Sequence, residues 1–179
     1  NEKNARQSDV DIFPFGDTFE IRNKVFETLL AWFNTRNGAS RTYYAVRGSV
    51  VTIYIKDINR KYQIVSSNAK NIYDIIGRFD LTHIQWALHK QGGTGMKFYG
   101  TPQAAFAMRE KITRFSNLRQ IKAYRMVKAL HCGYDVEKSD HIMEKIIDIT
   151  SLIEDPANTQ LQTIIREFYG YYYPTTMVG

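Results

Sequence analysis

The stretch Ser8-Asp9-Val10-Asp11-Ile12-Phe13, close to the start of the chain, decides how the remaining sequence is interpreted. Side chains alternate between the two faces of a strand, so Asp9 and Asp11 would share one face while Val10 and Ile12 point into a core. Two carboxylates held side by side repel each other unless a cation lies between them. A hard divalent ion such as Mg²⁺, bound by one or two carboxylates together with substrate phosphates, meets that need. The alternative is that both aspartates are solvated residues leading into the first helix.

Composition and charge restrict the class of protein. The chain has 179 residues, of which 44% are hydrophobic and 23% charged, which suits a single compact domain or a domain with a helical appendage. It shows no membrane-spanning run and no signal-peptide pattern, so we expect a soluble protein that is not secreted and has no membrane partner. Cys132 is the only cysteine, which favours a reducing, cytoplasmic compartment. The net charge of +6 favours polyanionic partners such as nucleic acid or nucleotides.

The first hundred residues alternate between helical and strand patterns. Apolar residues recur at four-residue spacing from Ile21 through Val25 and Leu29 to Phe33, which predicts a helix that ends at Asn37-Gly38. Strand-like runs follow at residues 41–46, 49–56 and 61–66, and their short connections predict an antiparallel meander. We further expect a short helix at 69–77, a long strand at 78–88 and a returning strand at 96–99. In the long strand, Asp80 would share a face with Thr82, Ile84 and Trp86.

The remainder of the chain is predicted to be helical. Thr101-Pro102 is typical of a helix start, and further helices are predicted from Leu118 to His131, from Ser139 onward, and from about Ala157 to Phe168. The predicted fold class is therefore α/β (α+β), with a mixed, largely antiparallel sheet. The expected domains are an α/β core at residues 1–100 and a helical part at 101–179 packed on it.

This arrangement resembles the DNA polymerase β-like nucleotidyltransferase superfamily. The resemblance rests on Asp9-Val10-Asp11-Ile12-Phe13 followed by a long helix, a meander and a third aspartate in Phe79-Asp80-Leu81-Thr82. The second motif, with Thr101-Pro102 and Lys122-Ala123-Tyr124-Arg125, is similar to motifs of nucleotidyltransferase-like proteins from large DNA viruses. The resemblance covers about three-quarters of the chain.

The resemblance implies a site, cofactors and partners. Asp9, Asp11 and Asp80 would be catalytic residues that hold two Mg²⁺ (or Mn²⁺) ions, with Asp80 also activating the acceptor hydroxyl. The implied partners are a nucleotide triphosphate and an RNA or DNA acceptor, in the cytoplasm or in a virus particle.

One departure from the family leaves two alternatives open. The family carries a Gly-Ser pair on a helix before the Asp-x-Asp strand, where only residues 1–8 stand here. We expect either that the missing piece was removed or not included, or that the protein keeps the fold without the reaction. In the second case it would be a structural or assembly component, for example of a virus particle, that binds a polyanion or a protein partner.

A basic stretch is the remaining candidate for binding. Arg119, Lys122, Arg125 and Lys128 recur at three-residue spacing along one predicted helix. They are predicted to contact the phosphates of RNA, DNA or a nucleotide. The alternative is the solvated side of an amphipathic helix.

Overall fold

The computed structural model describes residues 9–37, 42–90, 92–93, 95–117 and 122–137 of the chain. The chain divides into two compact units, residues 1–75 and 76–179, which are described separately. These units differ from the two predicted domains, 1–100 and 101–179, whose organisation stays a prediction. The helices predicted from Ser139 onward lie outside the described residues. No helix within the described ranges is long and apolar enough to cross a membrane.

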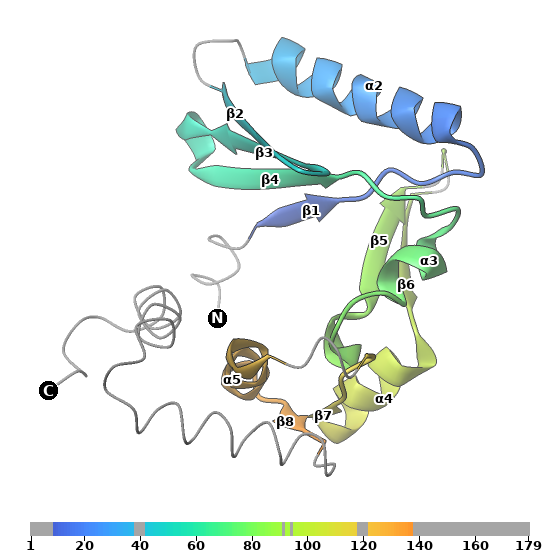
Figure 1. Ribbon diagram of the computed structural model, residues 1–179, viewed down its shortest axis with the longest axis vertical. Coiled ribbons are helices and arrows are strands. Elements are labelled where there is room, and N and C mark those ends of the chain that lie inside the picture. The colour runs from blue at the N-terminus through green and yellow to red at the C-terminus, as the bar shows by residue number, and fades with distance from the viewer. Residues whose placement is uncertain (1–8, 38–41, 91, 94, 118–121, 138–179) are drawn as a thin grey trace, which may run out of the picture. The chain divides into compact units, whose positions relative to one another are not determined.

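The first unit is a sheet covered on one face by a long helix (Figure 1). Its elements are β1 (Val10–Ile12), α2 (Phe19–Asn37), β2 (Thr42–Arg47), β3 (Val50–Ile55), β4 (Arg60–Val65) and the short helix α3 (Ile72–Ile76). The strand order is β1-β4-β3-β2, with β1 parallel to β4 and the other neighbours antiparallel. The strand predictions are thereby confirmed to within about one residue at each end.

The core of the first unit lies between α2 and the sheet. Phe33, Ile53, Ile55 and Ile64 are buried there, and Phe26, Leu29 and Leu30 of α2 pack against them. The predicted inward stripe of α2 is wrong at its start, because Ile21 and Val25 are 48% and 40% exposed. The helix does end at Asn37 as predicted.

The second unit combines a hairpin with short helices and strands. Its elements are η2 (Thr82–Ile84), β5 (Trp86–Lys90), β6 (Met96–Gly100), α4 (Pro102–Glu110), β7 (Ile112–Thr113), α5 (Ala123–His131) and β8 (Asp135–Val136). Strands β5 and β6 are antiparallel, as predicted, and β7 pairs with β8 in parallel. Thr101 caps α4 by accepting a hydrogen bond from the Ala104 amide at 3.0 Å, which confirms the predicted helix start.

The long strand predicted at residues 78–88 is wrong. A single turn of 3₁₀ helix, η2, interrupts it, and only Trp86–Lys90 is a strand. The interruption is stabilised by Gln85, whose side-chain amide donates to the Phe79 carbonyl at 3.1 Å and accepts from the Thr101 hydroxyl at 2.7 Å. Asp80 therefore does not share a strand face with Trp86. The short helix predicted at 69–77 is also shorter, spanning Ile72–Ile76.

Candidate active site

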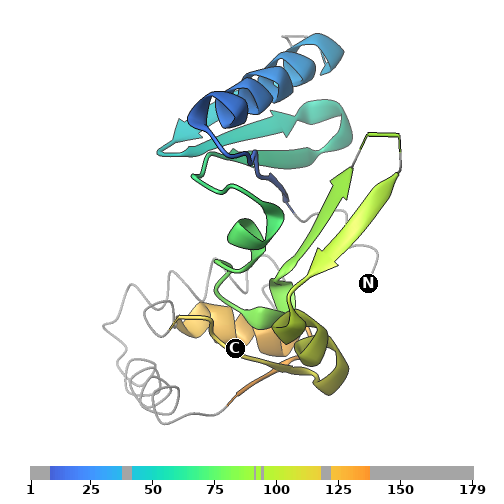
Figure 2. The same cartoon turned by 90° about the vertical axis from the view of Figure 1, so that its right-hand side faces the viewer.

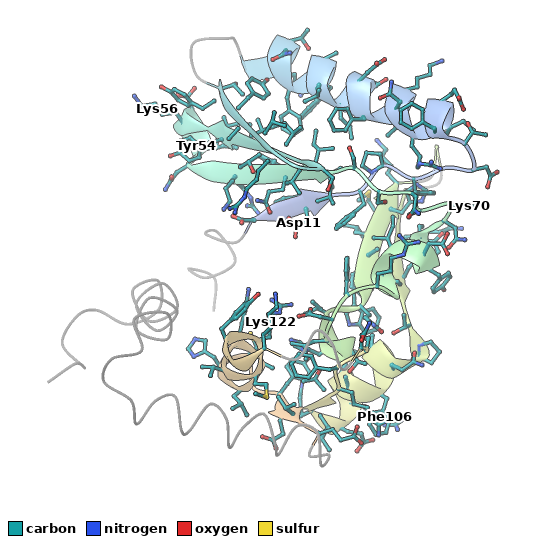
Figure 3. All side chains as sticks on the ribbon, viewed as in Figure 1. Asp11, Tyr54, Lys56, Lys70, Phe106 and Lys122 are labelled. Carbon is teal, nitrogen blue, oxygen red and sulfur yellow. The ribbon has the colours of Figure 1, made fainter. Side chains whose placement is uncertain are left out.

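Asp11 lies within strand β1, and Asp9 directly precedes the strand. Ile12 packs against the core beneath α2, so strand alternation turns Asp11 to the opposite face of the sheet. Figure 3 shows Asp11 on the side of β1 that faces away from α2. Asp9, two residues earlier, is exposed like Asp11. The role of this pair as metal ligands stays a prediction.

A lysine of the neighbouring strand already pairs with the first of these carboxylates. Lys61 of β4 places its Nζ atom 2.7 Å from Oδ2 of Asp9, and about two-fifths of each side chain is exposed. The pairing follows from the parallel register, in which Val10 stands opposite Tyr62 and Asp11 opposite Gln63. The positive charge beside Asp9 is therefore the ammonium group of Lys61.

Among the described residues, the one opposite Asp11 on β4 is an amide and not a third carboxylate. The register partner of Asp11 on β4 is Gln63, whose own antiparallel partner on β3 is Thr52. The Gln63 amide lies 3.4 Å from the Thr52 hydroxyl. Within either unit, the described residues include no group of three or more His, Cys, Asp or Glu side chains that could hold a metal ion. Two carboxylates plus phosphate oxygens are nevertheless a common Mg²⁺ ligand set, so Asp9 and Asp11 fit a metal that arrives with a nucleotide.

The third predicted ligand, Asp80, belongs to the second unit and is bound there by an arginine. Nε and Nη2 of Arg125 lie 2.6 Å from the two carboxylate oxygens of Asp80. Only 18% and 20% of the two side chains are exposed. The carboxylate also raises the pKa of the Arg125 guanidinium, mainly through these hydrogen bonds. The convergence of Asp80 with Asp9 and Asp11 stays a prediction.

A neutral histidine lies next to this ion pair. His83 Nδ1 is 2.9 Å from the hydroxyl of the buried Thr113, and the ring stacks on Tyr134 with centroids 4.4 Å apart. Burial lowers the pKa of His83 to about 4; Arg125 lowers it too, whereas Asp80 opposes the shift. His83 is thus both packed and hydrogen-bonded within the second unit. The partner Thr113 has no sequence signal, because it lies thirty positions away.

Only some residues of the predicted basic face are exposed and available to a ligand. Lys122, at the start of α5 (Figure 3), and Lys128 are exposed and remain candidates for phosphate contact. Arg125 instead turns toward Asp80, so its guanidinium is engaged within the protein. Arg119 lies outside the described residues.

The described part of the first unit has a small cavity of about 50 Å³ near the ends of β1 and β4. Its walls include Pro14, Arg22 and Ser66. Arg22 already donates to the Gly16 carbonyl at 2.7 Å. This volume is large enough for water but far smaller than the several hundred Å³ of a nucleotide pocket.

Solved structures of tRNA enzymes share this architecture. The Thermotoga maritima CCA-adding enzyme complexed with tRNA matches with a TM-score of 0.58 at 13% identity, over 90% of this chain and 38% of that one. A tRNA-processing enzyme with CTP matches at 0.53 and 13% identity, over 83% and 40% of the two chains. A tRNA nucleotidyltransferase with a primer tRNA and an incoming ATP analogue matches at 0.50 and 13%, over 92% and 52%. The fold is of the nucleotidyltransferase type.

This similarity establishes the fold and leaves the reaction open. The chain spans between 38% and 52% of the length of these three solved proteins. No protein-family model and no curated protein sequence matches the chain. The predicted mixed, largely antiparallel α/β fold is confirmed, while the resemblance to proteins of large DNA viruses stays a prediction.

Proposed function

We propose that this chain is a metal-dependent nucleotidyltransferase-type domain that binds a nucleoside triphosphate as its Mg²⁺ complex. The observation that carries the proposal is the exposed Asp11 on the face of β1 turned away from α2, with the exposed Asp9 directly before the strand. The shared fold with nucleotidyltransferases supports it. Mn²⁺ would serve in place of Mg²⁺, since both prefer oxygen ligands.

The roles of the residues follow from their surroundings. Asp9 and Asp11 hold the metal together with the phosphates of the nucleotide, and the bound ion neutralises phosphate charge. Lys61 sits at the same carboxylate as the metal would, so the two cations compete for Asp9. Asp80 serves as the third ligand and accepts the proton of the acceptor hydroxyl, which requires Arg125 to release it. Lys122 and Lys128 contact the phosphates of an RNA or DNA acceptor.

A second function is favoured by the ion pairs. Two of the three predicted metal ligands, Asp9 and Asp80, are each bound by a cationic side chain of the protein. A domain with permanently neutralised carboxylates would keep the fold without catalysis. It would then act as a structural or assembly component, for example of a virus particle, that binds a polyanion or a protein partner.

Metal-dependent thermal stabilisation tests the proposal. Mg²⁺ with a non-hydrolysable nucleoside triphosphate at about a hundred times its Kd should stabilise the wild type by about 2.7 kcal/mol. Asp11→Asn should remove most of that gain. Asp17→Asn, which neutralises an exposed aspartate of the same unit, is the matched control and should retain it. Equal gains in the wild type and Asp11→Asn would overturn the metal site.

An activity measurement separates the two functions. The wild type should extend a labelled RNA or DNA oligonucleotide with a nucleotide in Mg²⁺ or Mn²⁺, and Asp11→Asn should not. Stabilisation by nucleotide without any extension would favour the non-catalytic function.

A further inference from the structure

The hairpin of β5 and β6 exposes an apolar surface that the nucleotide site does not use. Figure 2 shows the two strands as a ribbon extending away from α4 of the same unit. Three of its large apolar side chains, Leu88, Met96 and Phe98, are 60%, 56% and 68% exposed. Such concentrated exposure on one small ribbon indicates a binding surface.

The register gathers this surface on one face of the hairpin. Trp86 pairs with Gly100, Leu88 with Phe98, and Lys90 with Met96. Strand alternation therefore places these six positions on the same side. Their opposite side carries Ala87, His89, Lys97 and Tyr99.

Phe98 is supported by a second aromatic ring. Trp86 stacks on it with centroids 5.1 Å apart and an interplanar angle of 19°. The stack depends on Gly100, because a Cβ atom at that position would lie 2.2 Å from the indole ring of Trp86. The indole thus lies flat across the Gly100 backbone, and the exposed phenyl ring of Phe98 is held in place beside it.

Charge distinguishes the classes of partner. The two strands carry Lys90 and Lys97 and contain no aspartate or glutamate. Lys90 is exposed and lies on the same face as Phe98. Lys90 stands one residue pair along this face from Phe98, and neither strand carries an acidic residue. Single-stranded nucleic acid suits such a face, because an aromatic ring can stack on a base while a cation contacts the backbone.

We propose that this face binds single-stranded nucleic acid, with a base stacked on Phe98 and the adjacent phosphate held by Lys90. This function goes beyond the proposed nucleotide site, because it needs neither a metal nor the aspartates of β1. Every base has an aromatic face that can stack on Phe98, so we expect this surface to bind a nucleic-acid strand without sequence preference.

Fluorescence anisotropy of the full chain with a fluorescein-labelled oligoadenylate RNA, in EDTA at low salt, tests this proposal. Phe98→Leu keeps an apolar side chain but removes the ring, and should weaken binding by about tenfold or more. Phe98→Tyr keeps the ring and should bind within about twofold of the wild type. Lys90→Gln should reduce the slope of log K against log salt by about one. Because Phe98 is largely exposed, its variants should retain the wild-type melting temperature.

Two further measurements sharpen the result. In a Trp32→Phe background, Trp86 is the sole tryptophan, and its fluorescence should be quenched by the RNA. Asp11→Asn should bind the RNA as the wild type does, so failure of the nucleotide site leaves this result intact. Equal affinity of Phe98→Leu and the wild type would overturn the proposal and leave the face to a protein partner. Equal binding of a duplex of the same length would overturn it as well, because paired bases cannot stack on the ring.

Discussion

Arg125 binds Asp80 through two parallel hydrogen bonds of 2.6 Å, across forty-five positions of sequence. The pair joins helix α5 to the segment that precedes η2, and the Asp80 carbonyl also accepts from the Ser116 amide at 2.8 Å. A two-point arginine–carboxylate pair with both side chains mostly buried is among the stronger ion pairs in proteins. Any metal bound by Asp80 must therefore compete with this arginine.

A double-mutant cycle measures the strength of that competition. Asp80→Asn and Arg125→Gln should each destabilise the second unit, because each leaves one partly buried charge without its partner. Their effects should be coupled by about 1–3 kcal/mol, so the double variant should be more stable than the sum of the single effects predicts. Urea unfolding followed by Trp86 fluorescence in the Trp32→Phe background gives the four free energies. Additive effects would contradict a direct interaction.

Local sequence patterns were sufficient to predict the helices and strands whose formation depends on neighbouring residues. The meander was predictable because β-branched residues and tyrosines cluster between short turns, and α4 because Thr101 and Pro102 favour a helix start. The prediction of a strand at 78–88 failed because the Gln85 side chain forms hydrogen bonds with Thr101 and Ser116, sixteen and thirty-one positions away. A tertiary hydrogen bond of this kind leaves no periodic signal.

In the candidate site, too, the sequence predicted what depends on neighbouring residues and missed what depends on tertiary contacts. The outward orientation of Asp11 follows from strand alternation, which is a local property. The ion pair between Asp9 and Lys61 depends on the register of β1 against β4, fifty-two positions apart. The sequence contains 24 lysines and arginines that could pair. Charge complementarity alone could not single out one of them.

Removing Lys61 should strengthen metal-dependent nucleotide binding. Its ammonium group competes with the ion for Asp9, and an exposed pair of this kind contributes up to about 1 kcal/mol. Lys61→Gln should therefore lower the Kd for the Mg²⁺–nucleotide complex by about two- to fivefold, as measured by calorimetric titration. Lys56→Gln removes the same charge from an exposed position of the same unit and should leave the Kd unchanged. Weaker binding by Lys61→Gln would show that this lysine contacts the phosphates instead.

Gln85 should be a major contributor to the stability of the second unit. Its side chain is 4% exposed and bonds to the Phe79 carbonyl, the Ser116 hydroxyl and the Thr101 hydroxyl. Gln85→Leu has a similar size but leaves the buried Thr101 hydroxyl without its acceptor, which should cost about 2–4 kcal/mol. Gln103→Leu, on the exposed first turn of α4, should stay within about 0.5 kcal/mol of the wild type. Equal urea midpoints for Gln85→Leu and Gln103→Leu would contradict a stabilising role for the buried hydrogen bonds of Gln85.

The pKa of His83 makes the second unit sensitive to mild acid. The folded pKa is about 4, against an ordinary value of 6.5, because burial disfavours the charged ring. Between these two values the unfolded chain binds a proton that the folded chain does not, so stability falls as the pH decreases through this range. After allowance for the partly exposed ring, the loss from His83 at pH 5 is about 1 kcal/mol.

His83→Gln isolates this contribution from the carboxylates that titrate in the same range. In the Trp32→Phe background, the His83→Gln variant should lose about 1 kcal/mol less than its parent between pH 7.5 and pH 5 in urea unfolding followed by Trp86 fluorescence. The imidazole resonance of His83 should titrate in the folded protein with a midpoint near pH 4. A midpoint near 6.5, or identical pH dependence of the two proteins, would show that the stacked ring bonded to Thr113 is accessible to solvent and accepts a proton without disturbing the fold.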